Sequence, residues 1–349
     1  MNAHIIGYGG YIPCWRIKGS EIARAHSADW DKLFASIGVH EKSVPAHDED
    51  AATLAVEAAS RAVARAFCNA GDIGALFVGS ESHPYAVKPT ATMVAHALGV
   101  QRYCYAADLE FACKAGTAVL ITAAAHVAAQ CADYALAIGA DTAQSAPGDV
   151  LEYSAAAGGA AFVLGARVEH ALATIEHTCS ITTNTPDFWR RAGGAYPEHA
   201  GRFTAQPAYF AHVLDVAQTL MNRTGIAVAD VDHVVFHQPN GRFPLVAAKK
   251  LGFSSEQLKL GFLAPVVGNT YSAASLLGLC AVLDEAAAGQ TILVVSYGSG
   301  SGADALVLTS TELLPSSQPK AACIKDFIAA KRYVDYQQYR QIMEHIIHG

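Results

Sequence analysis

Apolar and polar positions divide the chain into two kinds of segment, which are short apolar runs and longer alanine-rich stretches with helical spacing. Residues 73–79 (IGALFVG) and 134–139 (YALAIG) are predicted as buried strands. Residues 51–67 have helical spacing after the acidic run 48–50, which suits a helix entry. Residues 3–8 are predicted as a short strand that runs into a glycine-rich turn. This alternation of strands and helices predicts an α/β fold.

The second half of the chain repeats the order of elements found in the first half. In each half the last strand follows a group of glycines. The similarity is weak residue by residue and stronger in the order of elements, so we predict a duplicated α/β unit. The matched runs are 73–79 with 231–237, 134–139 with 292–297, and 160–164 with 304–309.

Between the first two strands of each half, a turn of polar or small residues opens an alanine-rich helix. Residues 111–117 (FACKAGT) form this turn in the first half, and residues 268–274 (GNTYSAA) form it in the second. Cys113 and Asn269 lie at nearly the same distance before the next strand, so we expect the two positions to be equivalent. Equivalent turns of related halves meet across a pseudo-two-fold axis, where His237 at its strand end would join them.

The length of 349 residues suggests two domains and a tail. We predict halves at 1–168, which carries Glu81 and Cys113, and 169–314, which carries His237 and Asn269. A linker and helical tail follow at 315–349, beginning with a proline- and serine-rich stretch. The tail is predicted to pack on the body or on a partner.

Composition and charge exclude several classes of function. A formal net charge of −7 provides no basic field for nucleic acid. No apolar run approaches the roughly 20 residues that span a bilayer, and the start lacks the pattern of a signal peptide, so we expect a cytoplasmic protein without membrane association. The eight cysteines include no Cys-x-x-Cys pair, so no metal site is expected.

Four residues are candidates for chemistry, and each also has an ordinary structural explanation. Cys113 stands at a helix entry, where the helix dipole favours the thiolate, although most cysteines in such apolar surroundings are core residues. His237 ends a buried strand before a Pro-Asn-Gly turn. Asn269 is ordinarily a turn residue, and Glu81 is ordinarily a solvated loop carboxylate.

Two glycine-rich stretches are not nucleotide-binding loops. Residues 297–302 (YGSGSG) lead into a strand, so the helix N-terminus that would bind phosphate is missing. Residues 7–10 (GYGG) are followed by Ile12-Pro13 rather than by an amphipathic helix.

The segment DLEFACKAGT at 108–117 resembles the nucleophile segment of archaeal-type hydroxymethylglutaryl-CoA synthases. The resemblance extends over nearly the whole chain and implies the thiolase fold, with duplicated α/β halves in five layers, αβαβα. Its other runs are 79–90, 137–153, 185–191, 202–204, 236–244 and 268–277.

The resemblance implies a role for each candidate residue. Cys113 would carry an acetyl group, Glu81 would be the general acid/base, His237 would polarise the acceptor carbonyl, and Asn269 would hold the acceptor. This chain departs from the family pattern at Arg242, where a lysine is usual, and at Ala28, where an acidic residue is frequent. The residues implied to line the substrate or coenzyme A site are Ala28, Asp29, Ser154, Arg202, Thr204, Arg242 and Ser299.

The implied reaction joins acetyl-CoA to acetoacetyl-CoA, giving 3-hydroxy-3-methylglutaryl-CoA and CoA in the mevalonate pathway of isoprene biosynthesis. Coenzyme A thioesters would be substrates, and no permanently bound cofactor is implied. The low charge, the high alanine content and the duplicated fold predict a homodimer. The resemblance implies a further complex, with an acetoacetyl-CoA thiolase and a small zinc-ribbon/OB-fold scaffold protein.

Two alternatives stay open on the sequence. A related ketosynthase or acyltransferase would use Cys113, His237 and Asn269 on another acyl-thioester acceptor. It would not need Glu81 if loss of carbon dioxide generated its carbanion. A non-catalytic assembly subunit for a thiolase would need none of the four residues.

Overall fold

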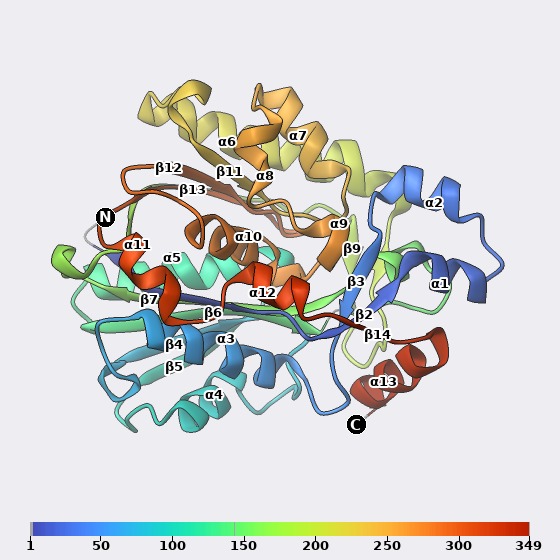
Figure 1. Ribbon diagram of the computed structural model, residues 1–349, viewed down its shortest axis with the longest axis horizontal. Coiled ribbons are helices and arrows are strands. Elements are labelled where there is room, and N and C mark those ends of the chain that lie inside the picture. Colours follow the sequence, from blue (N-terminus) through green and yellow to red (C-terminus); the bar gives the residue numbers. More distant parts are fainter. Residues whose placement is uncertain (1–2, 143, 349) are drawn as a thin grey trace.

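One mixed sheet of nine strands runs through the molecule, in the order β11-β12-β13-β8-β1-β7-β6-β4-β5 (Figure 1). The structure is a computed structural model that describes residues 3–142 and 144–348. The strands of this sheet are β1 (His4–Tyr11), β4 (Ala75–Gly79), β5 (Tyr105–Leu109), β6 (Tyr134–Thr142), β7 (Ala157–Gly165), β8 (Ala173–Thr182), β11 (His233–Phe236), β12 (Thr291–Val295) and β13 (Gly302–Ser310).

The two halves of this sheet have the same connectivity. In the first half β4 is parallel to β6, β6 is antiparallel to β7, and β7 is antiparallel to β1. In the second half β11, β12, β13 and β8 repeat that sequence of relations. The predicted duplication is therefore confirmed. The halves join where β1 meets β8 in the pairs His4↔Thr174 and Ile5↔Ala173.

The helices lie on both outer faces of the sheet and between its halves. They are α1 (Gly19–Ala25), α2 (Trp30–Ile37), α3 (Ala51–Arg65), α4 (Thr90–Leu98), α5 (Ala115–Ala128), α6 (Ala211–Thr224), α7 (Phe243–Leu251), α8 (Ser255–Lys259), α9 (Ala264–Val267), α10 (Ala274–Leu283), α11 (Leu314–Ser317), α12 (Ile324–Ala329) and α13 (Tyr336–His348). Figure 1 shows α6 and α7 outside one half, α3 and α4 outside the other, and α5 and α10 between them. This confirms the five layers.

The central position of α10 follows from its sequence. All ten of its residues are buried, and apolar side chains cover its whole circumference. Helix α5 is rich in alanine and packs against β4 and β6. Because these two helices fill the middle layer, the turns that open them face each other inside the protein.

The strand at the start of the chain is longer than its sequence suggested. We predicted a short strand followed by a glycine turn, but β1 runs straight through its glycines to Tyr11. A Cβ atom on Gly7 would lie 2.3 Å from the Ala62 carbonyl oxygen, and one on Gly9 would lie 2.5 Å from that of Ala58. These glycines therefore allow α3 to pack closely on the strand, which is a use other than turning the chain.

The tail is helical but interrupted. We predicted helix across 324–347, whereas the structure has α12, the short strand β14 (Arg332–Tyr333) and α13. Strand β14 joins β2 (Trp15–Lys18) and β3 (Glu41–Val44) in a small sheet. Tyr339 and Met343 of α13 are buried against residues of β2, α1 and β3. The apolar side of the tail is therefore packed on the body.

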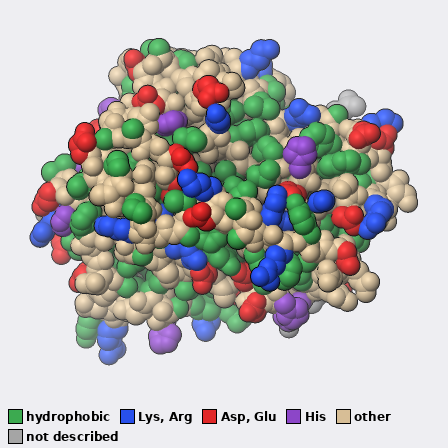
Figure 2. Space-filling view, viewed as in Figure 1, with side chains coloured by type: hydrophobic (Ala, Val, Ile, Leu, Met, Phe, Trp, Pro, Cys, Tyr) green, Lys and Arg blue, Asp and Glu red, His purple; other side chains and the backbone are tan. Residues whose placement is uncertain are grey.

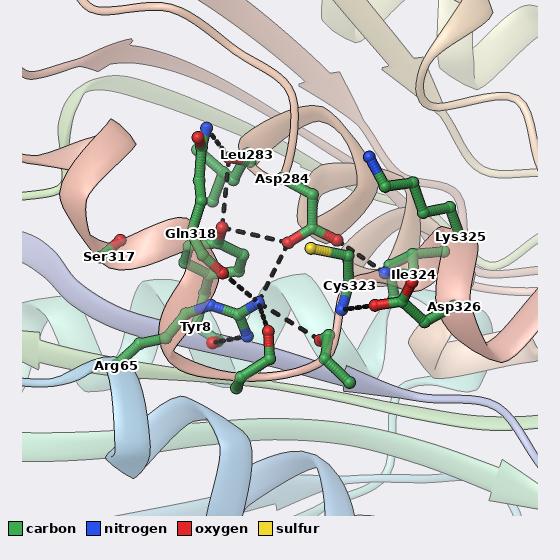
Figure 3. Close-up of polar contacts among 12 residues, drawn as sticks. Tyr8, Arg65, Leu283, Asp284, Ser317, Gln318, Cys323, Ile324, Lys325 and Asp326 are labelled. Atoms are coloured by element: carbon green, nitrogen blue, oxygen red, sulfur yellow. Dashed lines mark hydrogen bonds and ion pairs between the residues drawn. The ribbon is translucent and has the colours of Figure 1, made fainter.

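The linker before the tail is fastened by a buried arginine (Figure 3). The Arg65 guanidinium donates to the carbonyl oxygens of Gln318 (3.2 Å), Ala321 (2.8 Å) and Ala322 (3.2 Å). It also pairs with the buried carboxylate of Asp284 at 3.3 Å, while the other oxygen of Asp284 accepts from the Ile324 N–H at 2.7 Å. Because α3, α10 and the linker meet here, both halves hold the linker.

Figure 2 shows acidic and basic side chains interspersed over one face of the protein. Among the helices of the described residues, none is both long and apolar enough to cross a bilayer. No group of three or more His, Cys, Asp or Glu within the described ranges has the arrangement of a metal site, and the eight cysteines are free thiols.

Candidate active site

Cys113 lies in a short 3₁₀ turn, Ala112–Lys114, immediately before α5. Its side chain is buried, with 5% of the residue exposed. Ala112 has a φ of 45°, a conformation that non-glycine residues rarely adopt. The next side chain, Lys114, is buried and pairs with Asp304 of β13 at 2.8 Å. The turn that carries the thiol is therefore held by the second half.

The corresponding turn of the second half has the same backbone shape. It is the 3₁₀ turn Tyr271–Ala273 before α10, and Tyr271 has a φ of 50°. Aligning the two turns places Ser272, not Asn269, opposite Cys113. Our prediction that Asn269 and Cys113 are equivalent was therefore wrong by three residues, because sequence spacing to the next strand does not locate the start of each turn.

Glu81 follows β4 and lies beside Cys113. The thiol and the carboxylate are close enough for each to shift the pKa of the other, and the Oε1 atom of Glu81 is buried without a hydrogen-bond partner among the described residues. Burial, with the nearby charge of Asp141, raises the pKa of the Glu81 carboxyl well above its usual range.

The protonation of Cys113 differs from our expectation. Burial raises the pKa of the thiol well above its ordinary value, and the neighbouring carboxylates of Glu81, Asp141 and Asp187 add to the shift. The helix dipole that we expected to favour the thiolate is outweighed. Cys113 thus rests as a thiol, and Glu81 is the carboxylate with the largest influence on its pKa.

Asp141, at the end of β6, connects Glu81 to the turn of the second half. One of its carboxylate oxygens accepts from the Glu81 N–H (2.9 Å) and from the hydroxyls of Ser80 (2.7 Å) and Ser82 (2.6 Å). The other accepts from the Ser272 N–H at 2.8 Å. Sequence reasoning missed Asp141, although a carboxylate at the end of a buried strand was a visible signal.

Asn269 is buried and fixed through its backbone and its side chain. Its N–H donates to the Ser154 carbonyl at 2.7 Å, and its own carbonyl accepts from the Ala156 N–H at 2.8 Å. The side-chain oxygen accepts from the Tyr271 N–H at 3.0 Å. Since that bond orients the amide, the Nδ2 group remains as a directed donor.

His237 follows directly after β11 and is almost completely buried. Burial lowers the pKa of its imidazole to about 3, so the ring is neutral at physiological pH. Its carbonyl accepts from the Tyr209 hydroxyl at 2.7 Å. The ring centroid lies 6.3 Å from that of Tyr297, whose phenol is near enough to Cys113 for the thiol to influence its pKa.

A cavity of about 960 Å³ opens beside Glu81. Phe188 and Tyr271 form part of its wall and pack around Cys113. Ser299 also lines it, as predicted for a substrate-binding residue. Asp187 and Phe188 were not predicted as site residues; the fully buried carboxylate of Asp187 accepts from the Tyr297 hydroxyl and the Gly300 N–H, each at 2.6 Å.

The other predicted coenzyme A residues fall into separate places. Ala28 and Asp29 precede α2, and Asp29 is the N-cap of that helix. The Arg242 guanidinium, at the start of α7, lies over the ring of Phe34 in α2. Ser154 holds the backbone of Asn269, as described above. Thr204 and the backbone of Arg202 belong to the 3₁₀ turn Gly201–Thr204, and the Arg202 side chain lies outside the described part of the structure.

The chain is similar to known proteins over nearly its full length. It is 54% identical to the hydroxymethylglutaryl-CoA synthase of Methanothermobacter thermautotrophicus, with 97% of each chain covered. It is 52% identical to that of Methanocaldococcus jannaschii, with 99% of each covered. Residues 221–310 match the family model described as 3-oxoacyl-[acyl-carrier-protein (ACP)] synthase III C terminal.

Solved structures show the same fold at low sequence identity. A hydroxymethylglutaryl-CoA synthase complexed with CoA is similar with a TM-score of 0.85 and 22% identity, covering 98% of this chain and 90% of that one. The 3-oxoacyl-(acyl carrier protein) synthase III of Pseudomonas aeruginosa has a TM-score of 0.81 and 23% identity, covering 88% and 98%. The thiolase-like architecture is common to both.

Proposed function

This chain belongs to the hydroxymethylglutaryl-CoA synthase family, and from that premise we propose that Cys113, Glu81, His237 and Asn269 carry its reaction. The reaction condenses acetyl-CoA with acetoacetyl-CoA, giving 3-hydroxy-3-methylglutaryl-CoA and CoA, and the name implies a place in the mevalonate pathway. The observation that carries the assignment is the unpartnered, buried Oε1 atom of Glu81 beside the Cys113 thiol, whose pKa the Glu81 carboxylate raises.

The first step is transfer of acetyl to Cys113. Glu81 takes the thiol proton as the sulfur attacks the acetyl-CoA carbonyl, and CoA leaves as the thioester of Cys113 forms. The raised pKa of Glu81 supports this step, because a stronger base removes a proton from a buried thiol more readily.

The second step makes the carbon–carbon bond. After returning its first proton to the leaving CoA thiolate, Glu81 removes one from the methyl group of the bound acetyl. The resulting carbanion attacks the ketone carbon of acetoacetyl-CoA. Neutral His237 supplies one N–H, and the oriented Nδ2 of Asn269 supplies another, where the ketone oxygen gains negative charge. Water then cleaves the Cys113 thioester, leaving a free carboxylate on the product and a thiol on the enzyme.

The coenzyme A contacts are part of the same proposal. Ala28, Asp29 and Arg242 around α2 would meet the nucleotide end, and Thr204 and Arg202 would extend that contact. The grouping of Ala28, Asp29 and Arg242 around α2 supports this. Ser154 holds the backbone of Asn269 and Ser299 lines the cavity beside Glu81, so both lie at the reacting end. The loss of positive charge in an Arg242→Ala variant should raise the KM for acetyl-CoA more than it lowers kcat.

The experiment separates acetylation from condensation. Glu81→Ala should acetylate Cys113 more slowly than the wild type, because the base for the thiol proton is missing, but acetylation should still be complete over minutes with acetyl-CoA. Condensation should become about 10²–10⁴-fold slower. Cys113→Ala should do neither. Cys280, which is also buried and lies within α10, is the matched thiol and should stay unmodified in peptide mass spectra. Near wild-type condensation by Glu81→Ala would refute the role of Glu81.

The proposed assembly is a homodimer. Strand β5 is an edge of the large sheet, and an open edge offers backbone groups to a second chain. Three exposed side chains lie on and near that edge and would be buried in a dimer: Tyr103, Tyr105 and Val87. Light scattering should give twice the chain mass, and Tyr105→Lys should shift the equilibrium toward monomer; a wild-type monomer at micromolar concentration would contradict the dimer.

The wider partners are proposed on the family resemblance. They are an acetoacetyl-CoA thiolase and a zinc-ribbon/OB-fold scaffold protein, in a cytoplasmic complex. The free thiols support a reducing compartment. Because the apolar side of α13 is packed on the body, only its outer, polar side is available to a partner. Substitutions on that side should weaken co-purification if the tail takes part.

The proposed units 1–168 and 169–314 are supported by the repeated strand connectivity.

A further inference from the structure

A segment of the second half crosses over the cavity beside Glu81. It comprises residues 183–200, which we call the strap, and it contains the small hairpin of β9 (Phe188–Trp189) and β10 (Glu198–His199). Phe188, Trp189 and Arg190 line the cavity from this side. The strap therefore forms a wall that belongs to one half over a catalytic group that belongs to the other.

The start of the strap is bound firmly to the second half. The Thr183 N–H donates to the Ser301 carbonyl at 2.9 Å, and the Thr185 N–H donates to that of Gly300 at 3.2 Å. The buried carboxylate of Asp187 adds its two bonds to Tyr297 and Gly300. These contacts fix the direction in which the next residues leave toward the first half.

Arg190 makes the contact with the first half. One guanidinium nitrogen donates to the Glu81 carbonyl oxygen at 2.6 Å, and the other donates to the Gln144 side-chain oxygen at 2.8 Å. Asp141 already holds the Glu81 N–H. Both peptide groups of Glu81 are thus bound by charged side chains, one anionic and buried and one cationic and on the strap.

We propose that Arg190 is a positioning residue for the general base, holding the Glu81 backbone so that its carboxylate faces the acetyl group on Cys113. This rests on the proposed role of Glu81. The two-pronged contact needs a planar guanidinium, because a single ammonium cannot reach both oxygens with the same geometry. Positioning matters because a shift of about 1 Å in a catalytic group can lower a rate by about 100-fold.

The charge of Arg190 has a second effect, which a purely structural contact would lack. Asp141 of β6 and Glu110 after β5 both raise the pKa of the Glu81 carboxyl, and the Arg190 cation opposes them; the Cys113 thiol also lowers it. Condensation requires ionised Glu81. The acidic limb of the pH–rate profile is the range in which condensation slows because Glu81 becomes protonated. Loss of the Arg190 charge therefore moves this limb to higher pH.

The test compares Arg190→Gln, Arg190→Lys and Arg191→Gln in the full chain. Arg191 is the next residue, is exposed, and has no side-chain hydrogen bond or ion pair with the described residues. We expect Arg190→Gln to lower kcat for condensation by about 10–100-fold and to move the acidic limb upward. Arg190→Lys keeps the charge but loses the geometry, so kcat falls while the limb stays near its wild-type position. Arg191→Gln should leave the limb in place.

Acetylation and unfolding controls separate the possible failures. All three variants should acetylate Cys113 and should unfold at the wild-type temperature. If Arg190→Gln has the wild-type acidic limb and kcat, the positioning role is overturned while that of Glu81 stands. If Glu81→Ala itself condenses normally, the proposed function fails first. A loss shared equally by Arg190→Gln and Arg191→Gln would also overturn the inference.

Discussion

A close approach between the two halves predicts a large effect for one methyl group. Gly116 lies in the first turn of α5, three residues after Cys113, and faces the turn Tyr271–Ala273. A Cβ atom added at Gly116 would lie 2.1 Å from the Ser272 carbonyl oxygen and 2.9 Å from Cδ1 of Leu276. The first contact is with backbone, which cannot rotate away, so Gly116→Ala must push the two turns apart.

The size of the effect follows from that distance. Ordinary contact requires the turns to separate by about 1 Å. Overpacking of this kind costs about 1–3 kcal/mol, and alanine in a helix recovers at most about 1 kcal/mol relative to glycine. We expect a net loss of about 1–2 kcal/mol and a Tm lower by about 2–5 °C. Because Ser272 also binds Asp141, Glu81 should move too, and kcat should fall by about 100-fold.

The assay pairs thermal unfolding with the rate of condensation. Gly71→Ala is the matched control, because a Cβ atom there meets nothing nearer than Nε2 of Gln101 at 4.0 Å. That variant should keep the wild-type Tm and kcat. A Gly116→Ala protein with wild-type Tm and activity would show that the halves approach each other less closely than described, and would remove the argument that their turns form one site.

Three further predictions concern buried charged or titratable groups. Burial lowers the pKa of Lys42 to about 7 from its unfolded value of 10.5, so the folded state binds fewer protons between those values and stability rises with pH across that window. Lys42→Met should remove this pH dependence of the free energy of unfolding, which is on the order of a few kcal/mol. The variant should then have equal urea midpoints at pH of about 7 and 9.5. A variant whose midpoint rises with pH as in the wild type would contradict the pKa shift. Arg65→Met leaves Asp284 buried without its cation and should lower the free energy of unfolding by about 3–5 kcal/mol in urea titrations; a loss below about 1 kcal/mol would contradict the buried pair. The His237 ring, with its pKa lowered to about 3, should show NMR shifts that do not change between pH of about 5 and 8, and a titration inside that range would refute its neutral state.

The order of the strands along the chain was predictable in both halves, because each strand is recognised from its own run of apolar residues. Short apolar runs such as 73–79 and 231–237 need no distant residue to be recognised, and the structure has strands within both. The glycines of β1 were misinterpreted because their reason lies in α3, whose backbone they approach. A glycine in the sequence shows that space or backbone freedom is needed, and only the fold shows which.

The sequence predicted which residues form the candidate site better than it predicted their protonation states. The sequence indicated Cys113 and Glu81, and in the structure the two side chains are close enough to shift each other's pKa. It did not reveal that the thiol is protonated, because that depends on burial and on carboxylates from three separate elements. Asp141 was missed for a similar reason, since its partners Ser80 and Ser272 are far from it in the chain.

Strand β1 has a consequence for the way in which the protein is made. It precedes the other strands of the large sheet in the chain, yet it lies in the middle of that sheet, between β7 and β8. Its first partner, β7, begins only at Ala157. Until that strand is synthesised, β1 is an apolar segment with both edges unpaired, which is a target for chaperones and for aggregation. The nascent chain, rather than the finished enzyme, is therefore the form that is most vulnerable in the cell.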